Sequence, residues 1–189
     1  MYDIIIVGAG PAGASAAIFS AKAGLKTLVL DNDKGMTKRA WIENHYGVME
    51  IDGPSMVELG KKQALKFGAE IVETKVTFVG EAEAGEGLVV ETEGGNYEAK
   101  HVILATGAIP ELAENSGLTI VDGTEPRIKF VAEVDEFGRT STPGIWAAGV
   151  AAGVSVHSII TAGDGARVAI NVISEIKGQR YVDHDVLKA

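Results

Sequence analysis

The residues best suited to chemistry are a run of small residues near the start of the chain and an acid that follows it. The run Gly8-Ala9-Gly10-Pro11-Ala12-Gly13 has the spacing G-x-G-x-x-G, and Asp31 follows about 20 residues later. In this pattern the first glycine permits a tight turn, the second lets the backbone approach a pyrophosphate, and the third lets a helix pack closely on a strand. The acid is placed to hydrogen-bond a ribose. Together these residues predict a site for a dinucleotide.

The segments around this run are the elements that such a site needs. Ile4-Ile5-Ile6-Val7 is short, apolar and β-branched, which predicts a buried parallel strand. A helix of small residues is expected from Ala14 to Ala23, with Gly24 as its stop and a second strand from Thr27 to Leu30. Pro11 suits the first helical turn, where its missing N–H costs nothing. The free amides and the positive dipole end at that helix start predict an anion site.

Composition limits the class of protein and its partners. The chain has 189 residues, a net charge of −9, 46% hydrophobic residues and no cysteine. Its length suits one sizeable core, so we expect a single domain over residues 1–189. Because the sequence contains no long basic run, we expect neither nucleic acid nor a membrane surface as a partner. The absence of a signal peptide and of a membrane-spanning run favours a cytoplasmic protein.

The same composition excludes several kinds of chemistry. Without cysteine the chain itself can form no disulfide, no thiolate metal site and no thiol redox centre. The four histidines lack the spacing of metal ligands, so we expect no metal. No side chain stands out as a general acid, base or nucleophile, and no catalytic residue is assigned. Asp164 and Arg167 lie one helical turn apart and are expected to form a pair on a helix surface.

After Asp31 the sequence predicts a loop, a helix and a small sheet. Residues 32–46 show no period and are expected as loop or irregular helix beside the dinucleotide, with Trp41, His45 and Tyr46 packed under it. A helix is expected from Gly53 to Phe67, with Lys61, Lys62 and Lys66 on its exposed side. Extended runs at 70–72, 75–79, 88–92 and 97–100, with an acidic turn at 80–87, predict a small antiparallel meander inserted as a crossover.

The last part of the chain predicts two more buried strands and a long helix. Residues 101–105 and 145–148 are apolar and suit parallel strands, whereas 111–127 shows no regular pattern before a brief strand at 130–134. A helix is expected from Ser158 to Lys177. Its expected buried stripe is Ile159, Ala162, Ala166, Ala169, Ile170 and Ile173. These alternating elements predict an α/β fold in which helices flank a parallel sheet.

Several segments resemble, in the same order, the FAD-binding domain of low-molecular-weight thioredoxin reductases and related FAD-dependent pyridine nucleotide-disulfide oxidoreductases. The segments are 8–13 with Asp31, 42–44, 63–70, 97–100, 105–110, 138–149 and 161–166. They span almost the whole chain. The resemblance implies a Rossmann-like FAD-binding fold: a parallel sheet flanked by helices, with the small antiparallel β-meander as a crossover.

The resemblance assigns residues to the adenosine half of FAD. Gly8 to Gly13 would hold the pyrophosphate, and Asp31 with the neighbouring Asn32 would hold the ribose. Val76 would offer its backbone to the adenine. Ala105, Thr106 and Gly107 would close over the adenosine side.

The resemblance also assigns the flavin half. Asn44 would contact the cofactor from its loop, and Gly149 and Val150 would lie beside the pyrophosphate and the ribityl chain. The amides of His157, Ser158 and Ile159 would point at the pyrimidine edge of the flavin. A helix start there favours the negative charge of a reduced flavin.

The sequence departs from the family pattern in three ways. The family inserts a nicotinamide-binding domain between its two FAD segments, but the interval from Ala113 to Lys129 is far below the roughly 50 residues of a small domain. The redox-active cysteines of that domain are also missing. The family's Ala-Gly-Asp reads Ala148-Gly149-Val150 here, which removes an acceptor for a ribityl hydroxyl and could cost about 1–3 kcal/mol of FAD binding.

Three functions remain open from the sequence. The first is a stand-alone FAD flavoprotein, a thioredoxin reductase-like oxidoreductase that exchanges electrons with a separate protein or a small molecule. The second is a non-catalytic FAD or nucleotide binder, such as a sensor, carrier or subunit. The third is an NAD(P)H-binding enzyme. Because thioredoxin reductases pair through their FAD domains, the resemblance also implies a homodimer, with apolar surface expected near Pro110 to Pro126.

Overall fold

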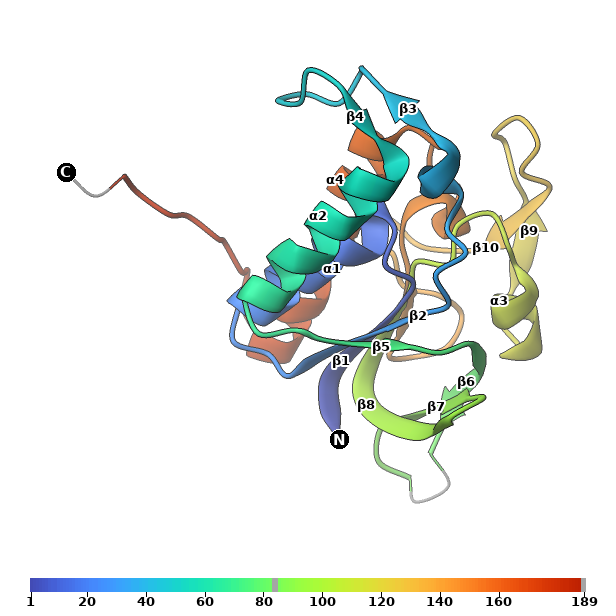
Figure 1. Cartoon of the computed structure of the whole chain (residues 1–189). Helices are drawn as coiled ribbons and strands as arrows, with labels where there is room; N and C mark the ends of the chain where they lie inside the picture. The colour runs from blue at the N-terminus through green and yellow to red at the C-terminus, as the bar shows by residue number, and fades with distance from the viewer. Residues whose placement is uncertain (83–84, 188–189) are drawn as a thin grey trace.

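A twisted sheet with β1 near its centre organises the chain (Figure 1). The computed structural model describes residues 1–82 and 85–187. In this part of the chain seven strands form the main sheet in the order β5-β2-β1-β8-β7-β6, and β11 also pairs with β8. The strands are β1 (Tyr2–Val7), β2 (Thr27–Asp31), β5 (Glu70–Glu73), β6 (Val76–Glu81), β7 (Leu88–Thr92), β8 (Gly95–Leu104) and β11 (Ile145–Ala147).

Strand β1 is buried on both faces, as its unbroken apolar run predicts. Ile4, Ile5 and Ile6 are all 0% exposed. The strand pairs in parallel with β2 on one side and with β8 on the other, and Ile6 lies opposite Val29 and Ile103. Because successive side chains point to opposite faces, Ile4 and Ile6 join one hydrophobic cluster and Ile5 joins the other. The fold is α/β, as predicted.

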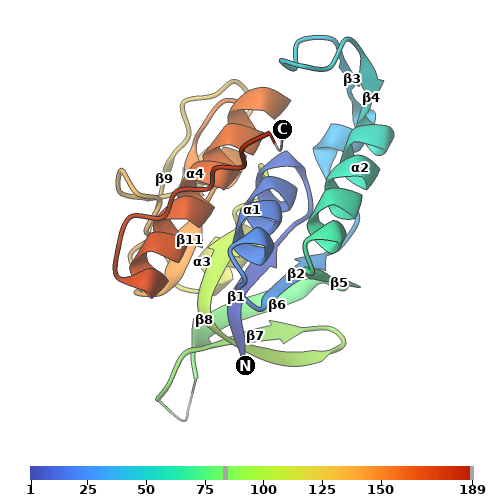
Figure 2. The same cartoon turned by 90° about the vertical axis from the view of Figure 1, so that its left-hand side faces the viewer.

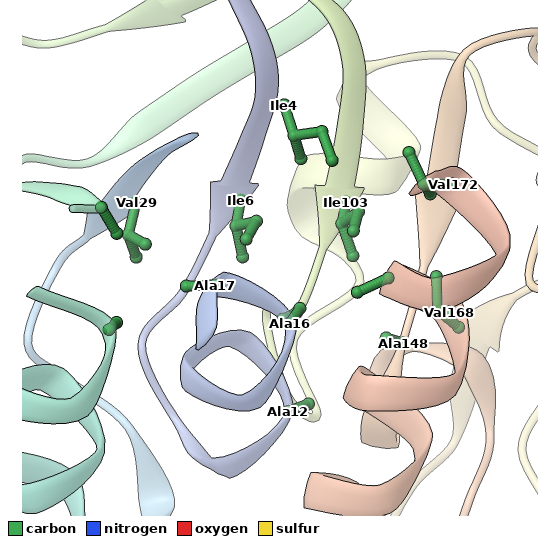
Figure 3. Close-up of a cluster of buried hydrophobic side chains, with 14 of the residues drawn as sticks. Ile4, Ile6, Ala12, Ala16, Ala17, Val29, Ile103, Ala148, Val168 and Val172 are labelled. Carbon is green, nitrogen blue, oxygen red and sulfur yellow. The ribbon is translucent and has the colours of Figure 1, made fainter. Parts of the chain in front are cut away.

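Three helices cover one face of the sheet, and they lie side by side in Figure 2. They are α1 (Pro11–Lys22), α2 (Gly53–Lys66) and α4 (Ser158–Lys177). Small residues let α1 and α4 meet closely: a Cβ on Gly165 would stand 2.0 Å from the Ala12 carbonyl oxygen. In Figure 3 the alanines of α1 face the isoleucines of the sheet and the valines of α4. Helix α1 begins at Pro11, three residues before the predicted start at Ala14.

The antiparallel meander is confirmed, except that the first of its expected runs, 70–72, belongs to a strand elsewhere in the sheet. Strands β6, β7 and β8 pair antiparallel in sequence, whereas β5 runs parallel to β2 at the other edge of the sheet. The segments 97–100 and 101–105, predicted as separate strands, form one strand, β8. Its first half pairs with β7 and its second half with β1 and β11, so one strand serves both parts of the sheet. Residues 83–84 of the expected turn at 80–87 lie outside the described residues.

The segment 111–127 is more regular than its sequence predicts. It contains α3 (Glu111–Asn115) and β9 (Ile120–Asp122), and β9 pairs antiparallel with β10 (Phe130–Ala132). Leu112, Ala113 and Leu118 are buried. The burial of these three side chains stabilises the segment, although its polar, glycine-containing sequence shows no periodicity that predicts a helix or a strand.

The loop after β2 is also built from short elements. It contains the 3₁₀ helix η1 (Met36–Arg39) and a two-stranded arm of β3 (Trp41–Ile42) and β4 (Ile51–Asp52). The arm projects beyond the start of α2 in Figures 1 and 2. Trp41 and Tyr46 are 62% and 92% exposed, so the prediction that they pack under the loop was wrong.

The buried stripe of α4 also differs from the prediction. The helix has the predicted bounds, but its buried residues are Thr161, Asp164, Gly165, Val168, Ala169, Val172 and Ile173. Ile159 is 37% exposed and Asp164 only 8%. Ala169 and Ile173 of the predicted stripe are buried. The hydrophobic residues alone missed the rest of the buried face, because the close contact with α1 is made by Gly165.

Candidate functional site

The carboxyl ends of four parallel strands meet around the start of α1. β1 leads into Gly8, β8 into Ala105, β11 into Gly149, and β2 ends in Asp31. Contacts join these ends: a Cβ on Gly8 would stand 2.4 Å from the Ala105 carbonyl oxygen. The Ala9 N–H donates to Asp31 Oδ1 over 3.2 Å. In open α/β sheets this edge is where ligands bind.

The glycines of the G-x-G-x-x-G run serve different purposes. Gly8 has a φ of +104°, and a Cβ on Gly13 would stand 1.8 Å from the Gly8 carbonyl oxygen. Both positions therefore need glycine for the protein's own packing. A Cβ on Gly10, by contrast, would meet no described atom within 4 Å. Gly10 therefore leaves open space at the carboxyl ends of β1, β2, β8 and β11, and that space is available to a ligand. We call this region around the start of α1 the groove.

The start of α1 can hold an anion. Its N-cap is Gly10, no side chain caps it, and its first turn contains no acidic residue. The first amides of a helix have no partner within the helix, and they carry the positive end of its dipole. Pro11 stands in the first turn as predicted, so it removes no amide that the helix itself would use. The geometry suits a pyrophosphate.

Asp31 is buried at the carboxyl end of β2 and is held by two partners. It is 7% exposed. Besides the bond from Ala9, its Oδ2 lies 2.7 Å from the Lys61 ammonium on α2. The prediction that Lys61 faces solvent was wrong, because its side chain is only 20% exposed. The spacing held a signal, since Lys61 lies four residues after Val57 and three before Ala64, both of which are buried.

A second carboxylate extends this charge cluster. Asp33 accepts a hydrogen bond from Lys61 over 3.2 Å and forms an ion pair with Lys38 of η1. Hydrogen bonds from Lys38 and Lys61 lower the pKa of Asp33 below its usual range. Burial lowers the pKa of Lys61, but its bonds to the two aspartates outweigh burial and leave that pKa raised. At neutral pH Lys61 is therefore charged and Asp33 is ionised.

Asn32 and Val76 are the other residues that the sequence predicts on the adenosine side. The Asn32 side chain accepts from the Lys34 N–H over 3.1 Å, so it is engaged within its own loop. Val76 is 7% exposed and begins β6. It follows closely on Thr74, whose N–H donates to the Asp31 carbonyl, which brings the backbone before β6 to the end of β2.

The connection after β8 lies against the G-x-G-x-x-G turn. The Ala105 N–H donates to the Val7 carbonyl over 2.9 Å. Thr106 is half-buried and donates to the Ile109 carbonyl over 3.4 Å. A Cβ on Gly107 would meet no described atom within 4 Å, but its φ of +70° favours glycine. Ala105 therefore supports the turn at Gly8, and the next two residues, Thr106 and Gly107, are half-buried.

On the opposite side, Gly149 stands between α1 and α4. It begins the 3₁₀ helix η2 (Gly149–Ala152), and with its φ of +71° a Cβ would come 2.8 Å from the Ala12 Cβ. Its N–H donates to Asp164 Oδ2 over 2.7 Å. Arg167 donates to Asp164 Oδ1 over 3.0 Å, so the predicted pair exists. Asp164 does not lie on the helix surface, however. It is buried, and it holds the Gly149 backbone at the groove.

The start of α4 is tied to the β3–β4 arm. His157 is the N-cap residue, and its Nδ1 lies 2.8 Å from Ser155 Oγ. Ser158 Oγ lies 3.0 Å from Nδ1 of His45, so His45 links the arm to the helix. Asn44, next to His45, and Ile159 are exposed. Sequence reasoning had no signal for the His45–Ser158 contact, because 113 residues separate its partners.

Comparison with known proteins identifies the family. The pattern of the pyridine nucleotide-disulphide oxidoreductase family matches residues 2–132 and 41–166. The chain belongs to this family. It is 41% identical over 117 residues to a thioredoxin reductase of Peptoclostridium acidaminophilum, across 60% of this chain and 36% of that protein. It is 40% identical over 115 residues to a thioredoxin reductase of Aquifex aeolicus, across 58% of this chain and 35% of that protein. The chain thus spans about a third of the length of these curated relatives.

Solved structures of thioredoxin reductases share the fold. The atypical thioredoxin reductase TRi from Desulfovibrio vulgaris Hildenborough has a TM-score of 0.81 at 20% identity, over 94% of this chain and 99% of that one. A thioredoxin reductase from Gloeobacter violaceus has a TM-score of 0.80 at 19% identity, over 99% of each chain. The chain is thus an oxidoreductase-family protein with a thioredoxin reductase-like, Rossmann-like fold, as the resemblance in its sequence implied.

Proteins of this family normally bind FAD, and the residues at the groove fit its adenosine half. Gly10 leaves the space that a pyrophosphate needs at an uncapped helix start, and Asp31 offers carboxylate oxygens to a ribose. The fit at the flavin half is poorer, because Val150 offers no side-chain acceptor. Among the described residues no group of three or more His, Cys, Asp or Glu could hold a metal ion. Over the same residues, no helix is both long and apolar enough to span a bilayer.

Proposed function

We propose that this chain is an FAD flavoprotein that exchanges electrons with a separate protein or a small molecule. The observation that carries the proposal is the position of Gly10. It leaves open space at the uncapped start of α1, within the same groove as the buried carboxylate of Asp31. An anion and a ribose are the two groups that such a groove suits, and FAD contains both.

The chain's own residues bind and orient the cofactor in this proposal. The first amides of α1 hold the pyrophosphate, and Asp31 accepts a hydrogen bond from the adenosine ribose. Gly149, held by Asp164, keeps the backbone after β11 beside the pyrophosphate. The start of α4 faces the flavin, where its dipole favours negative charge. When bound, FAD supplies the electron-transfer chemistry, which these residues tune by position and charge.

The proposal includes a separate partner because of what replaces the family's inserted domain. Between β8 and β11 the described chain forms only α3 and the β9–β10 pair, and the sequence contains no second G-x-G-x-x-G and no cysteine. A nicotinamide must hold its donor carbon about 3–3.5 Å from the flavin for efficient hydride transfer. We therefore expect slow reduction by free NADH or NADPH and no turnover of disulfides by the chain alone.

The identity of the cofactor is the first test. Protein purified from its native host is denatured, and the released cofactor is identified by chromatography and its absorption spectrum. We expect FAD at close to one per chain. Stoichiometric FMN would overturn the assignment of the adenosine half, and stoichiometric NAD would favour a nicotinamide-binding enzyme.

The electron-transfer part has its own test. Stopped-flow reduction under nitrogen compares dithionite with NADH and NADPH. We expect dithionite to bleach the flavin readily, and the nicotinamides to do so slowly and without saturation. Fast, saturable bleaching by either nicotinamide would contradict a separate electron partner. A flavin that no reductant bleaches would favour a non-catalytic binder.

We also propose that the chain forms a homodimer. Tyr46 and Met49 on the β3–β4 arm are each 92% exposed, and Ile160 at the start of α4 is 46% exposed. Apolar side chains this exposed are suited to burial by a partner. Near Pro110 to Pro126, where apolar surface was expected, Ile109 is 55%, Val121 37% and Phe130 46% exposed. Light scattering at micromolar concentration should give twice the chain mass, and a monomer mass would refute the dimer.

A further inference from the structure

Lys61 occupies a place that its neighbours on α2 do not share. Its ammonium lies 2.7 Å from Asp31 Oδ2 and 3.2 Å from Asp33 Oδ1, at the carboxyl end of β2. Lys62, the next residue, is 67% exposed in its side chain and pairs only with Glu58, on its own helix. The two lysines therefore have the same chemistry and different surroundings. One faces the adenosine side of the groove and the other faces solvent.

The bonding capacity of this ion pair is not exhausted. A lysine ammonium has three donors, and in the described chain Lys61 uses two of them, toward Asp31 and Asp33. A carboxylate has about four acceptor positions, and Asp31 uses one for Ala9 and one for Lys61. A donor and an acceptor thus remain beside each other at the end of β2.

A ribose diol matches this combination. Each hydroxyl group can donate one hydrogen bond and accept others, so a hydroxyl can donate to a carboxylate while its oxygen accepts from an ammonium. Hydrogen bonds to charged groups are roughly twice as strong as neutral ones. A carboxylate alone would engage only the O–H donor of the hydroxyl group. The pair of Asp31 and Lys61 engages both the donor and the acceptor of that group.

We propose that Lys61 is a specificity-determining residue of the adenosine subsite, donating a hydrogen bond to a ribose hydroxyl oxygen while Asp31 accepts a hydrogen bond from that hydroxyl group. This inference rests on the proposed function and names a second residue for the same site. Lys38 pairs with Asp33, and Lys61 pairs with both Asp31 and Asp33, so each aspartate at the end of β2 has a cationic partner.

The test separates a contact with adenosine from a contribution to folding. Apo-protein is titrated with FAD and with FMN, which lacks the adenosine half, for wild type, Lys61→Met and the matched control Lys62→Met. We expect Lys61→Met to weaken FAD by about 5- to 100-fold and to leave FMN unchanged, so that the preference for FAD over FMN falls. Lys62→Met should stay within about twofold of wild type for both ligands.

Each other outcome has a defined meaning. If wild type binds FAD and Lys61→Met keeps the same FAD-to-FMN ratio, the role of Lys61 is refuted while the proposed function stands. An equal loss of both ligands would assign Lys61 a structural role only. If wild type binds no FAD, the proposed function fails and this inference fails with it. Should Lys61→Met not fold by circular dichroism, Lys61→Gln keeps a neutral donor and is expected to retain part of the preference.

Discussion

The two ends of the groove are built in different ways. At the adenosine end, Asp31 is buried and fixed by the Ala9 amide and by Lys61, so that charged groups hold one another in place. At the flavin end, Val150 stands where the family pattern has an acid, and Ile159 and His157 are exposed. In the proposed site, charged groups of the chain itself line one half. The other presents apolar and open surface.

In the proposed site, the end at Asp31 recognises the nucleotide and the other end holds the flavin that transfers electrons. A buried ion pair costs desolvation energy, so the pair of Asp31 and Lys61 is weak evidence for stability. We infer that it fixes the position of the two side chains for a ligand. At the start of α4 the contacts are instead hydrogen bonds between a histidine and a serine, one joining His45 to Ser158 and one joining His157 to Ser155. On that side the buried Asp164, in an ion pair with Arg167, holds the Gly149 backbone. We infer that the chain itself selects the nucleotide, whereas a partner must complete the surroundings of the flavin.

The largest predicted effect breaks the complete end. In Gly10→Val the new side chain fills the space for the pyrophosphate without meeting a described protein atom near the Cβ position. We expect FAD affinity to fall by more than about 100-fold, or about 3 kcal/mol, with an unchanged melting temperature. Gly163→Val is the control, since its Cβ also meets nothing within 4 Å, on an exposed part of α4. Equal binding by the two variants would refute the pyrophosphate site.

The next prediction concerns the joint between the two ends. Asp164→Leu removes the acceptor of the buried Gly149 N–H, and an unpaired buried amide costs about 1–3 kcal/mol. We expect that loss of stability in urea unfolding, together with weaker FAD binding. Asp164→Asn keeps an acceptor oxygen and should lose less. If leucine and asparagine behave alike, the bond to Gly149 is not what Asp164 contributes.

A third prediction repairs the open end. Val150→Asp supplies the side-chain acceptor that the family pattern has for a ribityl hydroxyl. We expect FAD to bind more tightly by about 1–3 kcal/mol, roughly 5- to 150-fold, in a titration of apo-protein. Val154→Asp, on the same half-buried stretch, is a control for added charge alone. Unchanged or weaker binding by Val150→Asp would mean that the ribityl chain runs elsewhere.

The smallest predicted effect lies outside the groove. His101 on β8 accepts a hydrogen bond from Trp146 Nε1 at Nδ1 over 3.3 Å, and burial lowers its pKa. The unfolded chain then binds this proton more readily than the folded one. Stability is fully present above about pH 6.5, the ordinary pKa of histidine, and is lost as the pH falls through the lower folded pKa.

Thermal unfolding between pH 7.5 and 5 measures this effect, with tryptophan fluorescence as the probe of Trp146. His101→Gln should flatten the pH dependence, while His184→Gln in the exposed tail should not. A pH profile that His101→Gln leaves unaltered would assign the effect to other groups. FAD affinity should change little over this range, because His101 lies away from the groove.

What the sequence could and could not predict follows from the distance along the chain between interacting residues. Gly8 to Gly13, β1 and α1 are adjacent in sequence, and their spacing alone predicts the turn and the helix that follows. Lys61 and Asp164 act through partners 30 and 15 residues away, and a hydrophobic pattern cannot reveal a salt bridge between different elements. Both residues were accordingly expected on helix surfaces.

The same reasoning explains the errors in the fold. Strand β8 was predicted as two segments because its polar first half and apolar second half have different neighbours. The buried face of α4 was predicted only in part, at Ala169 and Ile173, because Gly165 makes the close contact with α1 and carries no hydrophobic signal. α3 is a five-residue helix, too short for its period to be recognised.

One measurement tests the central claim, that this chain builds the adenosine end and leaves the flavin end incomplete. Apo-protein is titrated calorimetrically with ADP, which carries the adenosine and pyrophosphate, and with FMN, which carries the flavin, each in competition with FAD. We predict that ADP binds and displaces FAD at lower concentration than FMN does. Tighter binding of FMN than of ADP would contradict the account.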